Sequence, residues 1–130
     1  MDQESASARE ARLKLAPDPR SPGSARRFVD RYLRRRRLPA DTVEAALLVS
    51  SELVTNAYLH GKGEIELRVS MRNDRVRIEV IDNGDGEAPA IRAEQGDEAA
   101  RWGLRIVDQL AFQWGVFEGT THVWADLAVS

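Results

Sequence analysis

The sequence contains no cysteine and only two histidines, which excludes a disulfide framework and a metal site built from cysteine or clustered histidine. No apolar run approaches the ~20 residues that a membrane-spanning helix needs. The net charge of -2 argues against direct nucleic-acid binding. Residues 1–10 are polar and mixed in charge, unlike a signal peptide, so we expect a cytoplasmic protein.

What remains is the composition of one globular domain. A chain of 130 residues can bury a core of its own, and we find no internal repeat and no domain boundary. Residues 1–10 are rich in Ser, Ala and Glu, which predicts a disordered tail. We therefore expect residues 11–130 to form the folded unit.

Hydrophobic periodicity predicts the order strand, helix, helix, strand, strand, helix, strand, strand. The first helix begins at a Ser21 N-cap and runs to about Arg37, and the second begins at the capping signal of Asp41 and Glu44. The second helix ends at Gly61, which we expect in the left-handed conformation. The predicted strands are an edge strand around Leu13 and Leu15, a hairpin of Glu64–Met71 and Arg75–Asp82, and closing strands Gln113–Phe117 and His122–Val129. Helices on one face of a mostly antiparallel sheet make an α+β fold, a two-layer α/β sandwich.

Polar side chains follow one stripe of the second predicted helix. Glu52, Asn56 and His60 are spaced by four, so each lies only about 40° further around the helix than the one before. The stripe borders the apolar arc, where a carboxylate or an amide is unfavourable without a partner. A magnesium ion would suit the Asn56 oxygen, and Glu52 could accept a proton from an attacking hydroxyl. Ordinary polarity of a helix surface explains the same spacing equally well.

A carboxylate ends the second strand of the predicted hairpin. The two-residue period places Asp82 on the same face as Ile78 and Val80, which turns it toward the core, where it needs a donor. The exocyclic amine of adenine is such a donor. Gly84 and Gly86 let the backbone pass close to a ligand. The alternative is a strand that ends in an ordinary Asp-Asn-Gly turn.

The third predicted helix begins at Trp102, Gly103 and Leu104, and carries Val107 and Leu110 on its buried face. Free backbone N–H groups and the positive end of the helix dipole attract phosphate at such a start. Gly103 permits close approach, and the preceding Arg101 adds a positive charge. Alternatively, Gly103 only relieves a clash between helix and sheet.

In this order and spacing, the three segments together resemble the GHKL superfamily, whose ATP-binding domain has the Bergerat fold. The resemblance covers about residues 11 to 128. The matching segments are residues 51–57 with His60 and Gly61 (N box), 82–86 (first glycine box), 102–107 (second glycine box), and 114–116 with 123–127 (closing strands). The closing strands resemble those of a short bacterial branch, the RsbW-like anti-sigma-factor serine/threonine kinases.

This resemblance implies a role for each site residue. Glu52 would be the general base, Asn56 the magnesium ligand and Asp82 the contact to adenine. The other nucleotide-binding positions that it implies are His60, Gly61, Gly84, Gly86, Arg101, Gly103, Leu104 and Thr121. ATP and Mg²⁺ are the implied cofactors, and the segment between Gly86 and Gly103 would be a lid over the phosphates.

Two positions depart from the family pattern. Arg101 stands where the second glycine box usually opens with a glycine, two positions before Gly103. His122 stands where the last strand usually offers a threonine near the phosphates, with Thr120 and Thr121 just before it. ATP binding is therefore better supported than catalytic turnover.

Two functions follow from the resemblance. The first is an anti-sigma factor kinase that phosphorylates a Ser or Thr of a STAS-type anti-anti-sigma partner and sequesters a sigma factor when that partner is absent. The second is a non-catalytic nucleotide-binding module that acts by holding a partner. A sensor histidine kinase or a gyrase-like ATPase is disfavoured, because 130 residues leave no room for the further domains of those enzymes. Homodimerisation is a further expectation from the resemblance alone.

One segment is strongly basic although the whole chain is slightly acidic. The arginines concerned are Arg26, Arg27, Arg31, Arg34, Arg35, Arg36 and Arg37. A solvated helix face explains such a run. The alternative is a docking surface for the sigma factor or the anti-anti-sigma partner.

Overall fold

The computed structural model of the chain describes residues 10–83, 104–117 and 121–129. The predicted order of elements is confirmed. The elements are β1 (Glu10–Leu15), α2 (Ser21–Arg34), α3 (Ala40–His60), β2 (Ile65–Arg72), β3 (Arg75–Ile81), α6 (Arg105–Leu110), β4 (Gln113–Val116) and β5 (Val123–Ala128). Glu10, which was assigned to the tail, begins β1, and the rest of that tail lies outside the described residues.

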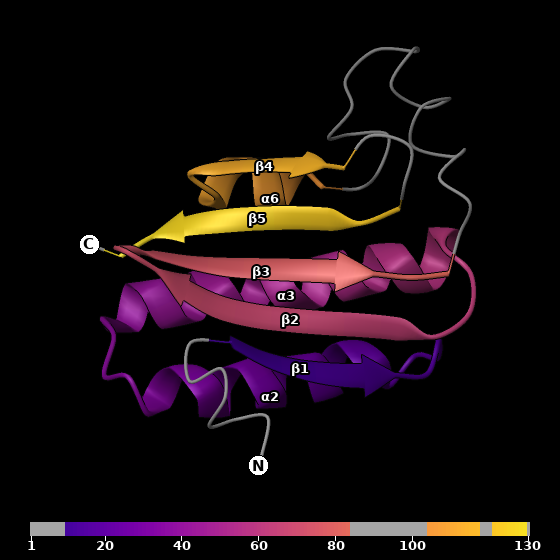
Figure 1. Cartoon of the computed structure of the whole chain (residues 1–130), viewed down its shortest axis with the longest axis horizontal. Helices are drawn as coiled ribbons and strands as arrows, with labels where there is room; N and C mark the ends of the chain where they lie inside the picture. Colours follow the sequence, from indigo (N-terminus) through magenta and orange to yellow (C-terminus); the bar gives the residue numbers. More distant parts are fainter. Residues whose placement is uncertain (1–9, 84–103, 118–120, 130) are drawn as a thin grey trace.

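All five strands form one antiparallel sheet in the order β1-β2-β3-β5-β4. The helices α2, α3 and α6 lie together behind this sheet in Figure 1, with α3 between the other two. The predicted α+β two-layer sandwich is therefore confirmed, with β1 as the predicted edge strand. The remaining face of the sheet carries no described helix, and we call it the helix-free face.

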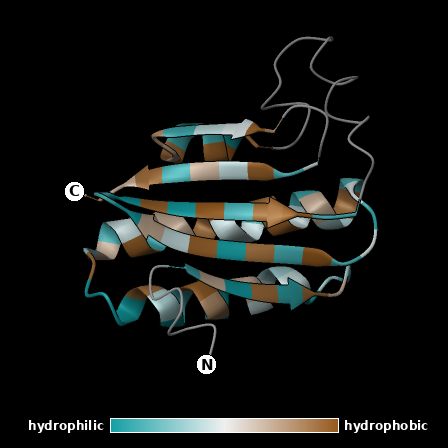
Figure 2. Ribbon diagram, in the orientation of Figure 1, coloured by the Kyte–Doolittle hydropathy of each residue, from teal (hydrophilic) through white to brown (hydrophobic). Residues whose placement is uncertain are grey.

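The core lies between the sheet and α3. Along β3, Val76, Ile78 and Val80 alternate with polar residues, and each is no more than 1 % exposed. Figure 2 shows the same alternation of hydrophobic and hydrophilic residues along the strands. From α3, Val49 and Leu53 are buried against them. Burying each such side chain contributes about 1.5–3 kcal/mol, so β3 and α3 hold a fixed relative position.

Both predicted helix starts are wrong in detail. Ser21 is the first residue of α2, and its hydroxyl donates to the Ala16 carbonyl in the preceding loop, while Arg20 occupies the N-cap. Pro39 occupies the N-cap of α3, with φ -57 and ψ 145, and no side chain caps this helix. Proline presets the extended backbone that an N-cap needs, so Asp41 lies inside the first turn, where its charge favours the helix dipole.

Two helix ends also differ from prediction. α2 ends at Arg34, and the chain then turns with Arg37 at φ 53, next to Leu38, whose place before Pro39 disfavours the helical conformation. Gly61 follows α3 as predicted but has an extended backbone, with φ -97 and ψ -163. The left-handed glycine is Gly63, at φ 70. The chain therefore reverses after the helix has ended rather than at its cap.

The third helix is shorter than predicted. α6 has 6 residues and begins at Arg105, with Leu104 at its N-cap. Val107 is buried as expected, but Leu110 is exposed because it ends the helix on the solvent side. Trp102 and Gly103 lie outside the described residues. Over the part of the chain that the structure describes, none of the helices combines the length and apolar character that crossing a membrane requires.

Candidate functional site

Three elements end or begin at one end of the sheet. Figure 1 shows the tip of β3, the last turns of α3 and the start of β5 at that end. The loop after α3 lies against the residues after β3, since the Asn83 N–H donates to the Lys62 carbonyl at 2.8 Å. Residues that are distant in the sequence therefore meet around Asp82.

Asp82 follows directly after β3 and is partly exposed. The Thr121 hydroxyl donates to Asp82 Oδ1, across 39 positions of sequence. The register explains this contact, because Val80 pairs with Val123 and the two chains continue side by side. The structure thus places Asp82 on the side of the sheet that strand parity predicts, with a partner just before β5.

Gly61 lies against the same carboxylate. A Cβ at this position would lie 1.9 Å from Asp82 Oδ2 and 2.7 Å from the Ala57 carbonyl oxygen, so only glycine fits. Gly63 has a similar role beside Asn83, whose side-chain nitrogen would be 2.9 Å from an added Cβ. Two glycines therefore let the loop after α3 approach the end of β3.

Asn56 is 4 % exposed and belongs to the last turns of α3. Its Oδ1 has no hydrogen-bond partner within the described structure. More than nine in ten buried polar groups are paired, so this oxygen is an acceptor for something else, and a magnesium ion fits it. The described residues include no group of three or more His, Asp or Glu that could hold a metal. Magnesium would therefore depend on Asn56 together with the phosphates it accompanies.

The other members of the predicted polar stripe differ in burial. Glu52, one turn before Asn56, is partly exposed, and His60, the last residue of α3, is exposed. Leu104 is fully buried and belongs to the hydrophobic core. The predicted site residues Gly84, Gly86, Arg101 and Gly103 lie outside the described residues.

His122 lies on the opposite face of the sheet from Thr121. Consecutive residues of a strand point to opposite faces, so Thr121 reaches Asp82 while His122 points to the helix-free face. There its Nε2 lies 2.7 Å from Glu79 Oε1. Thr121 is therefore the residue that contacts Asp82, and the departure from the family pattern at His122 stays a prediction.

Two buried carboxylates on the helix-free face were not predicted from the sequence. Asp126 accepts hydrogen bonds from Arg77 Nε at 2.6 Å, Arg77 Nη2 at 2.8 Å and Gln113 at 3.1 Å. Burial acts to raise the pKa of Asp126, but these hydrogen bonds hold it below the ordinary value. The hydrogen bond from His122 lowers the pKa of Glu79 against the opposing effect of burial. The sequence offered one signal for them, an acidic residue inside a predicted strand. The partners of such a residue depend on the register of the sheet, which the sequence does not give.

A family model for the histidine kinase-like ATPase domain matches residues 15–125. The match includes every element from α2 to β4, together with Asn56, Asp82 and Thr121. No curated protein matches the chain.

Proposed function

The chain belongs to the histidine kinase-like ATPase family of GHKL-type domains, and from that premise we propose that it is an anti-sigma factor serine/threonine kinase. The observation that supports this most strongly is the meeting of Gly61, Asp82 and Thr121, together with an unpaired buried oxygen of Asn56 in the last turns of α3. A carboxylate that can accept from an amine and an oxygen ligand for magnesium fit the two ends of a nucleotide. STAS-type anti-anti-sigma protein and sigma factor are the proposed partners.

The adenine end of the proposed site is at Asp82. Its carboxylate accepts from the exocyclic amine of adenine, while the Thr121 hydroxyl keeps it oriented. Gly61 keeps this region free of side-chain atoms that would displace the carboxylate. These contacts bind and orient the nucleotide, and they take no part in the chemistry.

The phosphate end of the proposed site is along α3. Asn56 would hold Mg²⁺, which neutralises phosphate charge when bound. Glu52 accepts the proton of a partner's Ser or Thr hydroxyl while that oxygen bonds to the γ-phosphorus and the bond to ADP breaks. Because phosphoryl transfer depends mainly on positioning and charge neutralisation, few catalytic groups suffice.

Glu52→Ala tests the kinase assignment directly. We expect transfer of labelled phosphate from ATP to a STAS-type partner to be lost, while ATP affinity by calorimetry stays within about twofold. Glu44→Ala, an exposed glutamate two turns earlier on α3, is the matched control and should transfer normally. Normal transfer by Glu52→Ala would remove Glu52 from the mechanism.

Arg101 favours a second function, a nucleotide-binding module without turnover. It stands where the family's second glycine box opens with a glycine. Calorimetry with ATP and Mg²⁺, run beside the phosphorylation assay, separates the two functions. Tight ATP binding without transfer to any STAS-type candidate supports the module.

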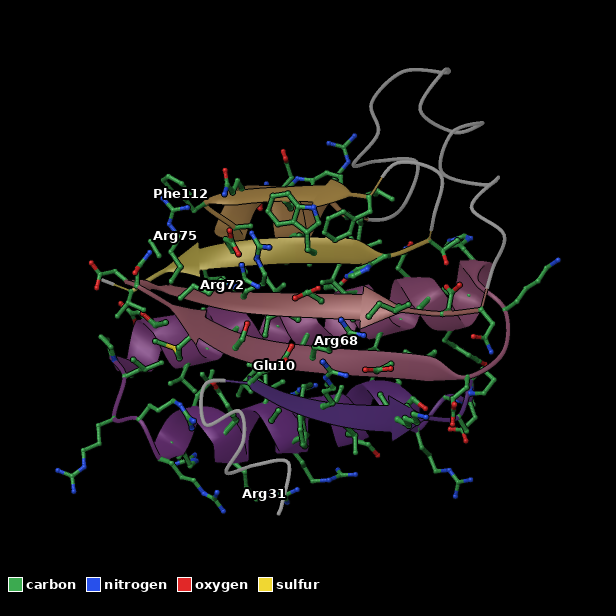
Figure 3. The ribbon with its side chains drawn as sticks, in the orientation of Figure 1. Glu10, Arg31, Arg68, Arg72, Arg75 and Phe112 are labelled. Atoms are coloured by element: carbon green, nitrogen blue, oxygen red, sulfur yellow. The ribbon has the colours of Figure 1, made fainter. Side chains whose placement is uncertain are left out.

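The arginine-rich end of α2 is the proposed docking surface for these partners. Arg34 pairs with Asp30 at 2.9 Å, and Arg36, just beyond α2, lies 3.6 Å from the Tyr32 ring centroid, so both already contact residues of α2. Arg31 and Arg37 are exposed. The double substitution Arg31→Glu and Arg37→Glu should weaken a partner complex, and the loss should shrink as salt rises. Arg72→Glu, at the β2–β3 turn on the helix-free face in Figure 3, is the control that should leave affinity unchanged.

A further inference from the structure

The Glu79–His122 pair lies on the helix-free face, directly behind the proposed adenine contact. Glu79 is 6 % exposed, and His122 Nε2 lies 2.7 Å from its Oε1. The Phe117 ring contacts His122 edge-on, with centroids 4.4 Å apart, and the Phe117 N–H donates to the His122 carbonyl at 3.0 Å. The imidazole and the backbone of His122 are therefore both held in place.

This pair and the Thr121–Asp82 contact form two links between the same two strands. Glu79 and Asp82 are both near the end of β3, and Thr121 and His122 are consecutive residues at the entry to β5. One link is on the helix side of the sheet and the other is on the helix-free side. The chain entering β5 is thus fixed to β3 from both faces, so a shift at His122 also moves Thr121.

The charge around Glu79 favours a lasting hydrogen bond. Arg68 of β2 is opposite Glu79 in the register, and Arg77 precedes it on β3. Both guanidinium groups favour the ionised carboxylate, as does the hydrogen bond from His122. An imidazole N–H donates to a carboxylate whether the ring is neutral or charged. Glu79 is therefore a constant acceptor, and His122 supplies the directional part of the link.

We propose that His122 is a positioning residue for the nucleotide site, which it serves by fixing the entry of β5 so that Thr121 holds Asp82 in the orientation that receives adenine. This inference rests on the proposed ATP site. His122 faces away from Asp82, so it acts only through its neighbour Thr121.

The first test compares ATP affinity by calorimetry in wild type, His122→Ala and His122→Gln. We expect the alanine variant to raise the Kd about 5–10-fold, the effect of losing one positioning hydrogen bond. Glutamine carries an amide N–H that can reach Glu79, so it should restore the Kd to within about twofold of wild type. Asp126→Asn is the matched control, because it alters another buried ion pair of β5 on the same face. It should lower Tm and leave the Kd unchanged.

A Kd that is unchanged in His122→Ala, or raised as much in Asp126→Asn, would overturn the inference. A second measurement separates it from the proposed function, because it uses no nucleotide. In a thermal-unfolding cycle of His122→Ala and Thr121→Val, we expect the Tm losses to be non-additive, since the two links hold one segment. Additive losses would overturn the inference even if ATP binds. Failure of the wild-type protein to bind ATP would overturn the ATP site, while the cycle would still decide whether His122 positions Thr121.

Discussion

Among single residues, Gly61 constrains the site most directly, because a Cβ there would overlap the Asp82 carboxylate and the Ala57 carbonyl. We expect Gly61→Ala to destabilise the protein by about 1–3 kcal/mol, as overpacking does, and to weaken ATP binding by displacing Asp82. Gly23→Ala is the matched control, since its Cβ would meet only the end of the Arg27 side chain at 3.7 Å. Urea unfolding and ATP calorimetry on both variants measure the two effects. Equal stability of the two variants would contradict the close approach at Gly61.

Single residues also show which features of the site could be predicted from the sequence and which could not. Asp82 could be predicted, because the alternation of β3 turns it toward the helices whatever its partners are. Gly61 ends α3 as predicted but is not left-handed, and its contact with Asp82, which joins α3 to β3, could not be predicted from a local cap rule. The choice between Thr121 and His122 depends on the register of β5 against β3, which periodicity alone does not fix.

At the scale of elements, strands were easier to predict than helix ends. Alternation of apolar residues defines a strand over its whole length, so β2, β3 and β5 agree with prediction to within about two residues. A helix end depends on one or two hydrogen bonds and on what the neighbouring loop offers. Ser21 donates to Ala16 instead of capping α2, and Pro39 occupies the N-cap of α3, where no side chain caps the helix.

The buried carboxylates Glu79 of β3 and Asp126 of β5 predict how the stability of the fold depends on pH. Asp126 and Glu79 both have pKa values lowered by folding, so their contribution to stability is complete above the unfolded value of about 4 and is lost as pH falls through the folded values. We therefore expect the Tm of the wild type to fall steeply below about pH 4. Asp126→Asn should be less stable at pH 7 by about 1–3 kcal/mol, and its Tm should fall less over the same acid range.

Circular dichroism melts between pH 7 and 3 measure this dependence. Asp74→Asn is the control, because Asp74 is an exposed carboxylate in the β2–β3 turn, and its melts should follow the wild type. If the Tm of Asp126→Asn falls as much on acidification as that of the wild type, the Asp126 carboxylate is not a source of the acid sensitivity.

At the scale of the whole molecule, the fold class follows from element order, because helices and antiparallel strands in this order leave few ways to cover one sheet face. The site does not follow in the same way. Asn56 belongs to α3, Asp82 follows β3 and Thr121 precedes β5, and only the strand order β3-β5, with α3 packed behind it, brings these segments to one end of the sheet. Without the family resemblance, the sequence would have suggested the polar groups but not their meeting.

A site built across three elements predicts that the bound nucleotide stabilises the whole fold. At ATP concentrations about 100 times the Kd, linkage adds about 2.7 kcal/mol, which raises Tm by on the order of 10 °C for a domain of this size. ADP carries the same base and should also raise Tm. GTP should not, because guanine presents a carbonyl oxygen where adenine presents its amine, and two acceptors would then face each other at Asp82. Asp82→Asn should lose most of the ATP-dependent shift, whereas Asp74→Asn should keep it. Equal Tm shifts with ATP and GTP would show that Asp82 does not distinguish adenine from guanine, because only a carboxylate that faces the amine separates the two nucleotides at this position.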